Sequence, residues 1–280
     1  MKIITMMGLL SALFSFAAEA EALRTGLLPK WELGAGIAGF HLPDYPGAEQ
    51  SRSYVLPFPY IIYRGERVKA DREGVRGLLF ESPHWDLNIS AGGSLPVSSG
   101  ENRARDGMDD LDFSFEFGPS LRLKLQESAR QKTHLRFNVR ALLDLDGFPS
   151  MNYEGWVFNP ELRWQRQLTD ELSWGARVQV RYGSKDYHDY FYGVAPQFAR
   201  LDRPAYRAPA GYNSTGSDIR VRWEAPSGWR VVMALSYVDL HDASFNDSPL
   251  FKKNSGAYFS LSIARILWRS NRRVDADPIE

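Results

Sequence analysis

The sequence predicts an all-β protein, an antiparallel transmembrane β-barrel. Three observations lead to this fold class: apolar and polar residues alternate in many segments, the longest alternating segments exceed ordinary strands, and short connections alternate with long ones. Alternation with a period of two gives a strand one apolar face and one polar face. In a barrel that crosses a membrane, the apolar face points outward to lipid and the polar face lines the lumen.

Residues 111–125, LDFSFEFGPSLRLKL, show the alternation most clearly. The odd positions are mostly Leu and Phe, whereas the even positions carry Asp112, Glu116, Arg122 and Lys124 among other polar residues. Soluble strands usually run ~5–6 residues, and a tilted membrane-spanning strand needs ~9–11. This run is longer than either figure and therefore fits a membrane strand better than a strand of a soluble sandwich.

The other strands and their connections follow the same pattern. The alternation recurs in residues 85–97, 135–143, 156–164, 172–182, 219–223 and 259–263, and a more uniformly apolar strand covers 229–240. Short connections at 127–131, 169–171 and 225–228 alternate with long ones at 98–110, 184–217 and 241–256. Outer-membrane barrels have short periplasmic turns and long outer loops, so this order favours a barrel over a sandwich.

The number of strands depends on residues 66–81. Plain counting gives eleven strands, but bacterial single-chain barrels have an even number. If residues 71–74 (DREG) form a turn, the segment becomes two short strands and the barrel has twelve; ten is the alternative. A second irregularity is Leu56-Pro57-Phe58-Pro59-Tyr60, because proline cannot donate to a strand ladder. We expect a bulge at the barrel rim there, in preference to a kink that aims residues into the lumen.

The sequences at the two ends of the chain indicate that it has three parts: a signal peptide, the barrel and a tail. Lys2, an apolar run over residues 3–16 and A-x-A sites at 18–22 indicate a signal peptide, residues 1–22. The barrel then covers residues 23–268, and residues 269–280 form a polar periplasmic tail, which we expect to be disordered. The mean hydropathy of −0.37 argues against a helical membrane protein. The net charge of zero gives no reason to expect a nucleic-acid partner.

No catalytic or metal-binding residue is predicted, no cofactor is implied, and we expect the protein not to be an enzyme. The chain has no cysteine, which excludes disulfides and thiolate chemistry, and its five histidines show no metal-ligand spacing. Ser184 and His188 lie in one segment with Asp186 and Asp189, but catalytic triads are defined by geometry and not by closeness in sequence.

The charged face of the predicted strands gives the candidate site residues. We expect these side chains to line the lumen: Glu116, Arg122, Arg140, Arg163, Arg177, Arg181 and Arg222. Two interpretations remain open: a narrow pore that prefers anions, or a lumen that ion pairs and inward-folded loops keep closed, which we favour. A barrel of about twelve strands lies between filled and open barrels, so size does not decide.

Two stretches resemble the MipA/OmpV family of outer-membrane proteins. Residues 31–64 contain a G-x-G strand, the loop DYPGA and the motif VLPFPY, and residues 187–212 contain YFYGV followed by tyrosine and glycine positions. Ser248-Pro249-Leu250 before the last strand fits the same pattern. The resemblance implies an outer-membrane location, in contact with outer-membrane lipid.

The resemblance also implies a role. The family's namesake is an MltA-interacting protein, which is thought to scaffold a lytic transglycosylase and a penicillin-binding synthase in peptidoglycan assembly. Other members are described as porin-like. The family has no agreed catalytic residues, so none is transferred. We therefore expect a scaffold of the cell envelope, with a narrow porin-like channel for small solutes as the alternative.

Overall fold

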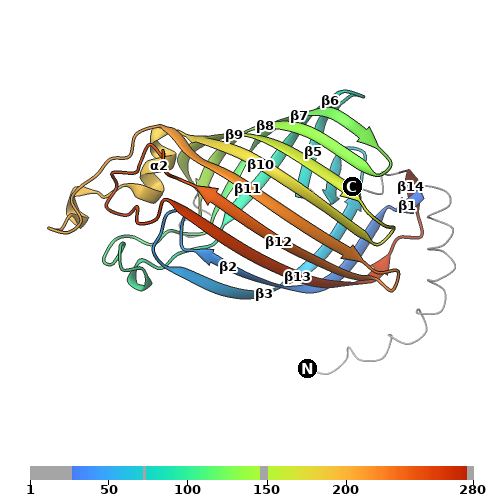
Figure 1. Cartoon of the computed structure of the whole chain (residues 1–280), viewed down its shortest axis with the longest axis horizontal. Coiled ribbons are helices and arrows are strands. Elements are labelled where there is room, and N and C mark those ends of the chain that lie inside the picture. The colour runs from blue at the N-terminus through green and yellow to red at the C-terminus, as the bar shows by residue number, and fades with distance from the viewer. Residues whose placement is uncertain (1–26, 72–73, 146–150, 276–280) are drawn as a thin grey trace, which may run out of the picture.

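A closed antiparallel barrel of twelve strands makes up most of the structure (Figure 1). The computed structural model describes residues 27–71, 74–145 and 151–275. The barrel strands of this part of the chain are β2 (Trp31–Pro43), β3 (Ser51–Arg64), β4 (Val68–Asp71), β5 (Gly74–Glu81), β6 (Trp85–Ser94), β7 (Ser114–Ser128), β8 (Gln131–Asp144), β9 (Asn152–Gln167), β10 (Leu172–Gly183), β11 (Gly211–Glu224), β12 (Trp229–Asp239) and β13 (Ser255–Arg269). Each strand pairs with the next along the chain, and β13 pairs with β2 to close the ring. The predicted fold class and the strand number of twelve are confirmed.

Residues 66–81 do form two short strands. Asp71 pairs with Gly74 in a tight β4–β5 hairpin, at the position where the sequence predicts a turn. This hairpin supplies the strands that make the count even. Within the described residues, this hairpin has a small contact with β3, where Tyr63 pairs with Ala70 and Arg64 with Lys69. No helix in the described ranges is long and apolar enough to cross a membrane.

The side chains of β7 show that the apolar face of the barrel wall points outward. Phe117 and Leu125 are 49% and 58% exposed on the outside, whereas Ser120 and Arg122 are 1% and 3% exposed. A soluble β-sandwich would bury the first pair and expose the second, so the outward apolar face identifies a surface that contacts lipid. One detail differs from the prediction: Leu111 lies before the strand, where it forms a bridge with Val97 and is buried under the loops.

Aromatic side chains gather at the two ends of the outer surface. Trp85, Trp223, Trp229 and Trp268 are exposed near the short turns, and Tyr153, Trp156, Tyr182 and Tyr237 are exposed near the long loops. Tyrosine and tryptophan prefer the membrane–water interface, where the ring is apolar and its polar atom reaches water. The band between these two girdles therefore marks the membrane-spanning part of the barrel.

The expected bulge at Leu56–Tyr60 is wrong. The pairing of β3 with β2 runs from Trp31–Tyr63 to Pro43–Ser51 without a register shift, so both prolines lie within a regular strand. The ladder accommodates them because β3 has a free edge beyond its short contact with β4. Proline is tolerated at such an edge since it has no N–H to leave unpaired.

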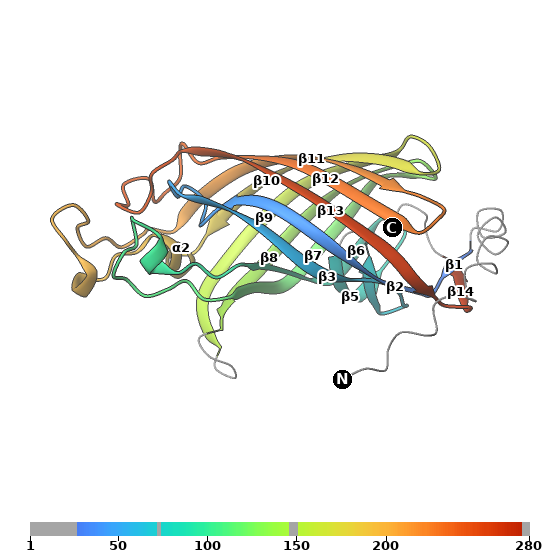
Figure 2. The same ribbon diagram turned by 90° about the horizontal axis from the view of Figure 1, so that it is seen from below.

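The long loops carry the remaining elements, η1 (Ser99–Glu101), α2 (Lys185–Tyr192) and η2 (Pro196–Phe198). They gather at one end of the barrel, and the short turns lie at the other (Figures 1 and 2). Ser184 begins α2 because its hydroxyl accepts a hydrogen bond from the backbone N–H of Tyr187. The predicted alternation of long and short connections thus separates two different ends.

The terminal segments meet beyond the barrel. β1 (Leu27–Pro29) pairs with β14 (Arg273–Asp275) in a two-stranded antiparallel sheet at the end with the short turns (Figure 2). The expectation of a disordered tail is therefore wrong for residues 273–275, because their backbone pairs with residues 27–29. The alternation of the sequence did not predict a strand at residues 27–29. The predicted signal peptide, residues 1–22, and residues 276–280 of the tail lie outside the described residues.

Candidate functional site

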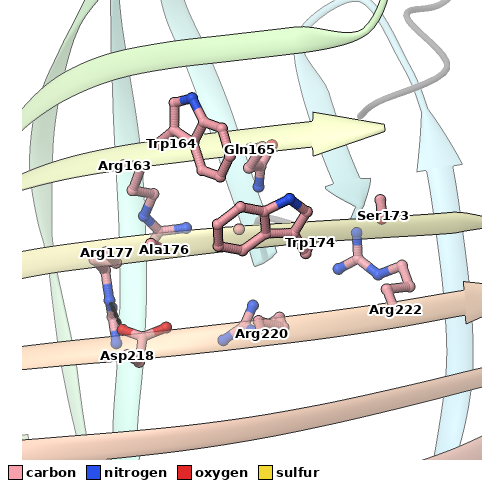
Figure 3. A pocket seen from close by; sticks show the side chains of 11 residues that line it. Arg163, Trp164, Gln165, Ser173, Trp174, Ala176, Arg177, Asp218, Arg220 and Arg222 are labelled. Carbon is pink, nitrogen blue, oxygen red and sulfur yellow. Dashed lines mark hydrogen bonds and ion pairs between the residues drawn. The ribbon is translucent and has the colours of Figure 1, made fainter. Parts of the chain in front are cut away.

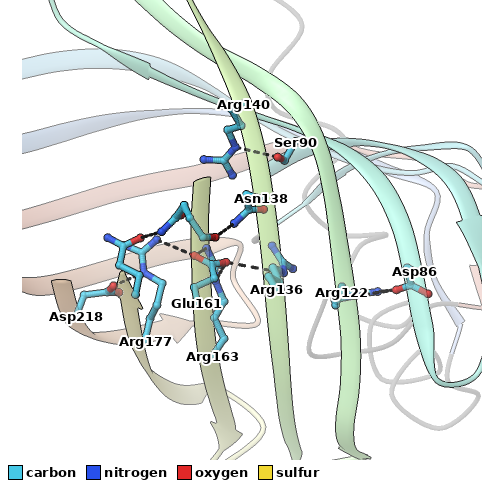
Figure 4. Close-up of polar contacts among 12 residues, drawn as sticks. Asp86, Ser90, Arg122, Arg136, Asn138, Arg140, Glu161, Arg163, Arg177 and Asp218 are labelled. Carbon is cyan, nitrogen blue, oxygen red and sulfur yellow. Dashed lines mark hydrogen bonds and ion pairs between the residues drawn. The ribbon is translucent and has the colours of Figure 1, made fainter. Parts of the chain in front are cut away.

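Charged side chains line the inner wall of the barrel along β6 to β11 (Figure 4). Asp86 of β6 is fully buried and accepts hydrogen bonds from Arg122 of β7, the one from Nε at 2.7 Å. Lys124 Nζ lies 3.0 Å from the other oxygen of Asp86. One carboxylate thus balances two cations on the neighbouring strand, which keeps this part of the wall closely packed.

Glu161 of β9 is the centre of a second group. Its carboxylate lies 2.8 Å from Arg163, 3.5 Å from Arg177 and 4.0 Å from Arg136. Arg177 also forms an ion pair with Asp218 of β11, so the group extends over four neighbouring strands. Because the barrel's alternation places all these residues on one face, strand pairing alone brings them together.

Glu116 of β7 joins the wall to helix α2. It forms ion pairs with Arg140 at 3.5 Å and with Arg181, and the hydroxyl of Tyr187 donates to it at 3.0 Å. Arg181 also donates to the same hydroxyl at 2.6 Å. Tyr187 is therefore a polar anchor that fixes α2 over the outer mouth of the lumen.

A small pocket on β9, β10 and β11 is rich in arginine (Figure 3). Its lining includes Arg163, Arg177, Arg220 and Arg222. Arg222 lies 3.8 Å from Glu224. Arg220 makes no hydrogen bond or ion pair with any residue in the described ranges, although Asp218 is close enough to interact with it electrostatically. The pocket is thus more positive than the surrounding wall.

The seven residues predicted to line the lumen fall into these groups. Arg122 belongs to the Asp86 group, Arg163 and Arg177 to the Glu161 group, Glu116, Arg140 and Arg181 to the Tyr187 anchor, and Arg222 lies beside Glu224. The sequence reasoning did not single out Asp86, Asp218 or Tyr187. The two aspartates occupy polar alternate positions of their strands, so the alternation could have identified them as residues of the inner face. The contact of Tyr187 depends on how the long loop folds, which the alternation does not predict.

The long loops form a hydrophobic core of their own above the barrel. Its buried members are Tyr45, Ala48, Val97, Leu111, Tyr192, Val194, Ala208, Leu240, Ala243, Phe245 and Leu250. Tyr192 and Phe245 stack with ring centroids 3.6 Å apart at its centre. We call this packed set of loops the outer cap. It is a small hydrophobic core of its own, at the end of the barrel with the long loops.

Two buried polar side chains of the outer cap have hydrogen-bond partners among its backbone carbonyls. Tyr45 donates to the carbonyl of Leu250 at 2.8 Å, and burial raises the pKa of Tyr45 to about 12. Arg105 is 4% exposed, and burial lowers the pKa of its guanidinium. It donates to the carbonyl of Phe191 at 3.2 Å and to that of Asp109 at 3.2 Å, so neutral backbone oxygens satisfy a buried charge.

Ser184 and His188 have contacts that belong to the cap. Ser184 Oγ accepts from the backbone N–H of Tyr187 and of Trp156, the latter at 3.0 Å. His188 is fully buried against Phe245, and its Nδ1 donates to the carbonyl of Pro209 at 2.7 Å. Burial lowers the pKa of His188, which keeps the ring neutral. Within the described residues, no group of three or more His, Asp or Glu is arranged to hold a metal ion.

Comparison with known families identifies the chain. The family model described as "MltA-interacting protein MipA" matches residues 35–267, which is most of the barrel. The protein belongs to the MipA family. No curated protein matches the chain.

Solved structures with a similar fold are outer-membrane proteins of low identity. An outer membrane channel from Pseudomonas putida F1 is 9% identical, with a TM-score of 0.48, and the match covers 85% of this chain and 96% of that one. OmpT of Vibrio cholerae is 9% identical (TM-score 0.37, 87% and 98% covered). The translocator domain of the autotransporter NalP from Neisseria meningitidis is 11% identical (TM-score 0.40, 90% and 92% covered). All three TM-scores are below 0.5.

The family and the architecture agree on location. A closed barrel with an apolar outer band and two aromatic girdles is built for lipid, and the chain matches the MipA family over residues 35–267. The MipA-family protein described here is therefore an outer-membrane β-barrel, and the expected localisation is confirmed.

Proposed function

We propose that this barrel is a scaffold that holds murein-cleaving and murein-synthesising enzymes at the inner face of the outer membrane. The observation that carries the proposal is the family match, whose description names an interaction with MltA. The partners are a lytic transglycosylase and a penicillin-binding protein. The protein itself performs no catalysis in this role.

The form of the two ends supports this role. At the end with the long loops, the outer cap packs a hydrophobic core of its own, which ties these loops to one another. At the other end, the β1–β14 sheet extends beyond the barrel, where periplasmic enzymes would meet it. Arg269, Arg272 and Arg273 give this end a basic character. Such a surface suits an acidic patch on a partner, because complementary charge speeds encounter and selects partners.

The test is binding of purified partners to the refolded barrel. A lytic transglycosylase of the MltA type and a penicillin-binding synthase are passed over the barrel held in lipid nanodiscs. We expect both to bind, and we expect Arg272→Glu with Arg273→Glu to weaken binding. The control is Arg200→Glu, a reversal of charge on the outer cap, where Arg200 is half-exposed and pairs with Asp106. No binding of either enzyme, or equal weakening by the control, would refute the scaffold.

The arginine pocket supports a second candidate function, a narrow channel that prefers anions. Arg220 has no ion-pair partner in the described part of the chain, so the wall of β9 to β11 carries positive charge for a passing anion. Single-channel recording in a planar bilayer tests this. Steady conductance whose anion preference falls in Arg220→Glu would support the channel, and a barrel that inserts but stays silent would exclude it.

A further inference from the structure

The barrel wall has a break in strand pairing between β3 and β6. β3 pairs with β4 only at Tyr63 and Arg64, and β5 pairs with β6 only as far as Ser90. Residues 51–62 of β3 and 91–94 of β6 therefore have no strand partner on the edges that face each other, within the described residues. Figure 2 shows β3 continuing past the short strand β5 toward the outer cap. We call this break the lateral gap.

The edge of β3 at the lateral gap is unsuited to a partner strand. The backbone N–H of Arg64 donates to the carbonyl of Lys30, on the β2 side of the strand. N–H groups alternate in direction along a strand, so odd-numbered residues of β3 direct theirs to the free edge. Pro57 and Pro59 are at such positions and have no N–H. Proline on an edge blocks pairing with another strand, so the gap is not a site for strand addition.

The lateral gap has defined limits. The β4–β5 hairpin closes it toward the end with the short turns. Toward the outer cap, the loop after β6 contacts the start of β3 and the residue before it: Arg52 of β3 forms an ion pair with Glu101, and Gln50 donates to the carbonyl of Glu101 at 2.9 Å. The lateral gap is thus a window in the barrel wall: β3 and β6 bound its sides, and the hairpin and the loop contact close its two ends.

The outside of the window faces the apolar part of the bilayer. Val55 and Ile61 of β3 are 72% and 52% exposed on the outer surface, and Phe117 of β7, on the far side of β6, is 49% exposed. In hydrocarbon, an open sheet edge is tolerated only where it is covered or lines a polar cavity. The free edge therefore requires something to occupy the window or the space behind it.

The inside of the window is positively charged. A side chain added at Gly92 of β6 would place its Cβ 3.6 Å from Arg140 Nη1 and 3.7 Å from Glu116 Oε2. Glu116 is a single carboxylate shared by two guanidinium groups, those of Arg140 and Arg181. This group keeps an excess positive charge at the inner side of the window, in reach of an anion that enters there.

The inner face of β3 beside the window is apolar. Alternation places Tyr54, Leu56 and Phe58 on the lumen side, because Ile62 and Arg64 of the same parity pack there with Glu32. Leu56 remains 40% exposed although it faces inward, and Phe40 of β2 adds a ring 6.3 Å from that of Tyr54. An apolar wall and a cationic group thus flank one opening.

We propose that the lateral gap binds an amphipathic anion from the bilayer, a single acyl chain that ends in a carboxylate or a phosphate. The chain passes between β3 and β6 against Leu56 and Phe58, and the head group binds Arg140 inside the lumen. Binding covers the free edge with hydrocarbon and gives the Glu116 group its missing negative charge. This site is independent of the periplasmic surface of the proposed scaffold and of axial conduction.

The experiment measures binding of 11-(dansylamino)undecanoate to the full barrel refolded in a non-ionic detergent, by fluorescence. Gly92→Trp fills the inner side of the window, since a Cβ at Gly92 meets only ordinary contact distances. The matched control is Gly77→Trp on β5, below the window, where an added Cβ has nothing within 4 Å. Gly92→Leu is a smaller second blocking variant, and the heat-dependent shift on gel electrophoresis shows that each variant is folded.

We expect Gly92→Trp to weaken binding by about tenfold, as when roughly two methylene groups lose their contacts, and Gly77→Trp to have no effect. We also expect the probe to bind more tightly than its uncharged alcohol. Competition by dodecanoate would identify a fatty acid, and competition by lysophosphatidylglycerol alone would identify a lysophospholipid. The proposal is overturned if the probe does not bind, if both tryptophan variants bind it equally, or if charge makes no difference.

Discussion

Glu116→Gln offers the sharpest test of the lumen's charge balance. The substitution keeps the size of the side chain and removes the single negative charge between Arg140 and Arg181. The side chains of the three residues are 12%, 16% and 23% exposed, so water screens their interaction little. Removing one partner of a buried ion pair typically costs about 3–5 kcal/mol. We expect a loss of unfolding free energy in this range.

The same substitution should loosen the outer cap. The Tyr187 hydroxyl donates to the Glu116 carboxylate at 3.0 Å, and a neutral amide is a weaker acceptor than a carboxylate. We expect amides of helix α2 to exchange hydrogen faster in Glu116→Gln than in the unchanged protein, while amides of the outer-cap core around Leu240 change little.

The assay is urea unfolding of the refolded barrel in lipid vesicles, followed by tryptophan fluorescence. Glu101→Gln is the control, because Glu101 also pairs with an arginine but is 68% exposed. An exposed pair is worth about 0–1 kcal/mol. In the double variant Glu116→Gln with Arg181→Gln, part of the loss should return, since one uncompensated cation is gone. Equal costs for Glu116→Gln and Glu101→Gln would refute the reasoning.

Three further outcomes follow from the cap. Phe245→Ala removes a fully buried ring that stacks on Tyr192, so it should cost about 3–5 kcal/mol, which urea unfolding measures; a loss below 1 kcal/mol would contradict the cap's core. His188 has a lowered pKa in the folded cap, so the unfolded chain takes up its proton first. The stability of the outer cap should therefore fall as pH drops below about 6.5, and faster hydrogen exchange of α2 amides would show this. If the His188→Gln variant loses cap stability with falling pH as much as the parent does, the role of His188 is refuted. Gly155→Ala should destabilise the cap by more than about 1 kcal/mol, because Gly155 has φ +100° and an added Cβ would lie within van der Waals radii of Ser184 Oγ; an unchanged thermal midpoint would argue against that contact.

Much of the barrel follows from the sequence alone. The strict alternation in residues 111–125 predicts an outward apolar face, and Phe117 and Leu125 have it. The DREG turn predicts the β4–β5 hairpin that makes the strand number twelve. These features depend on local properties, namely the period of two and turn chemistry, so they can be derived without knowing what lies across the barrel.

Other features needed the tertiary structure. Pro57 and Pro59 suggest a bulge in a sequence, but they lie in a regular strand because β3 has a free edge, and only the lengths of its neighbours create that edge. Leu111 continues the strand pattern and yet belongs to the outer cap, since loops far apart in the chain bury it.

For the charged face, too, the sequence predicts one part and only the tertiary structure decides the other. Sequence periodicity predicts that arginines lie on the lumen side of β7 to β11. It did not determine that Glu116 serves two of them and holds Tyr187 of α2, because that contact joins residues 71 positions apart. Local patterns fix which face a side chain takes, and long-range closure of the ring decides which side chains meet there.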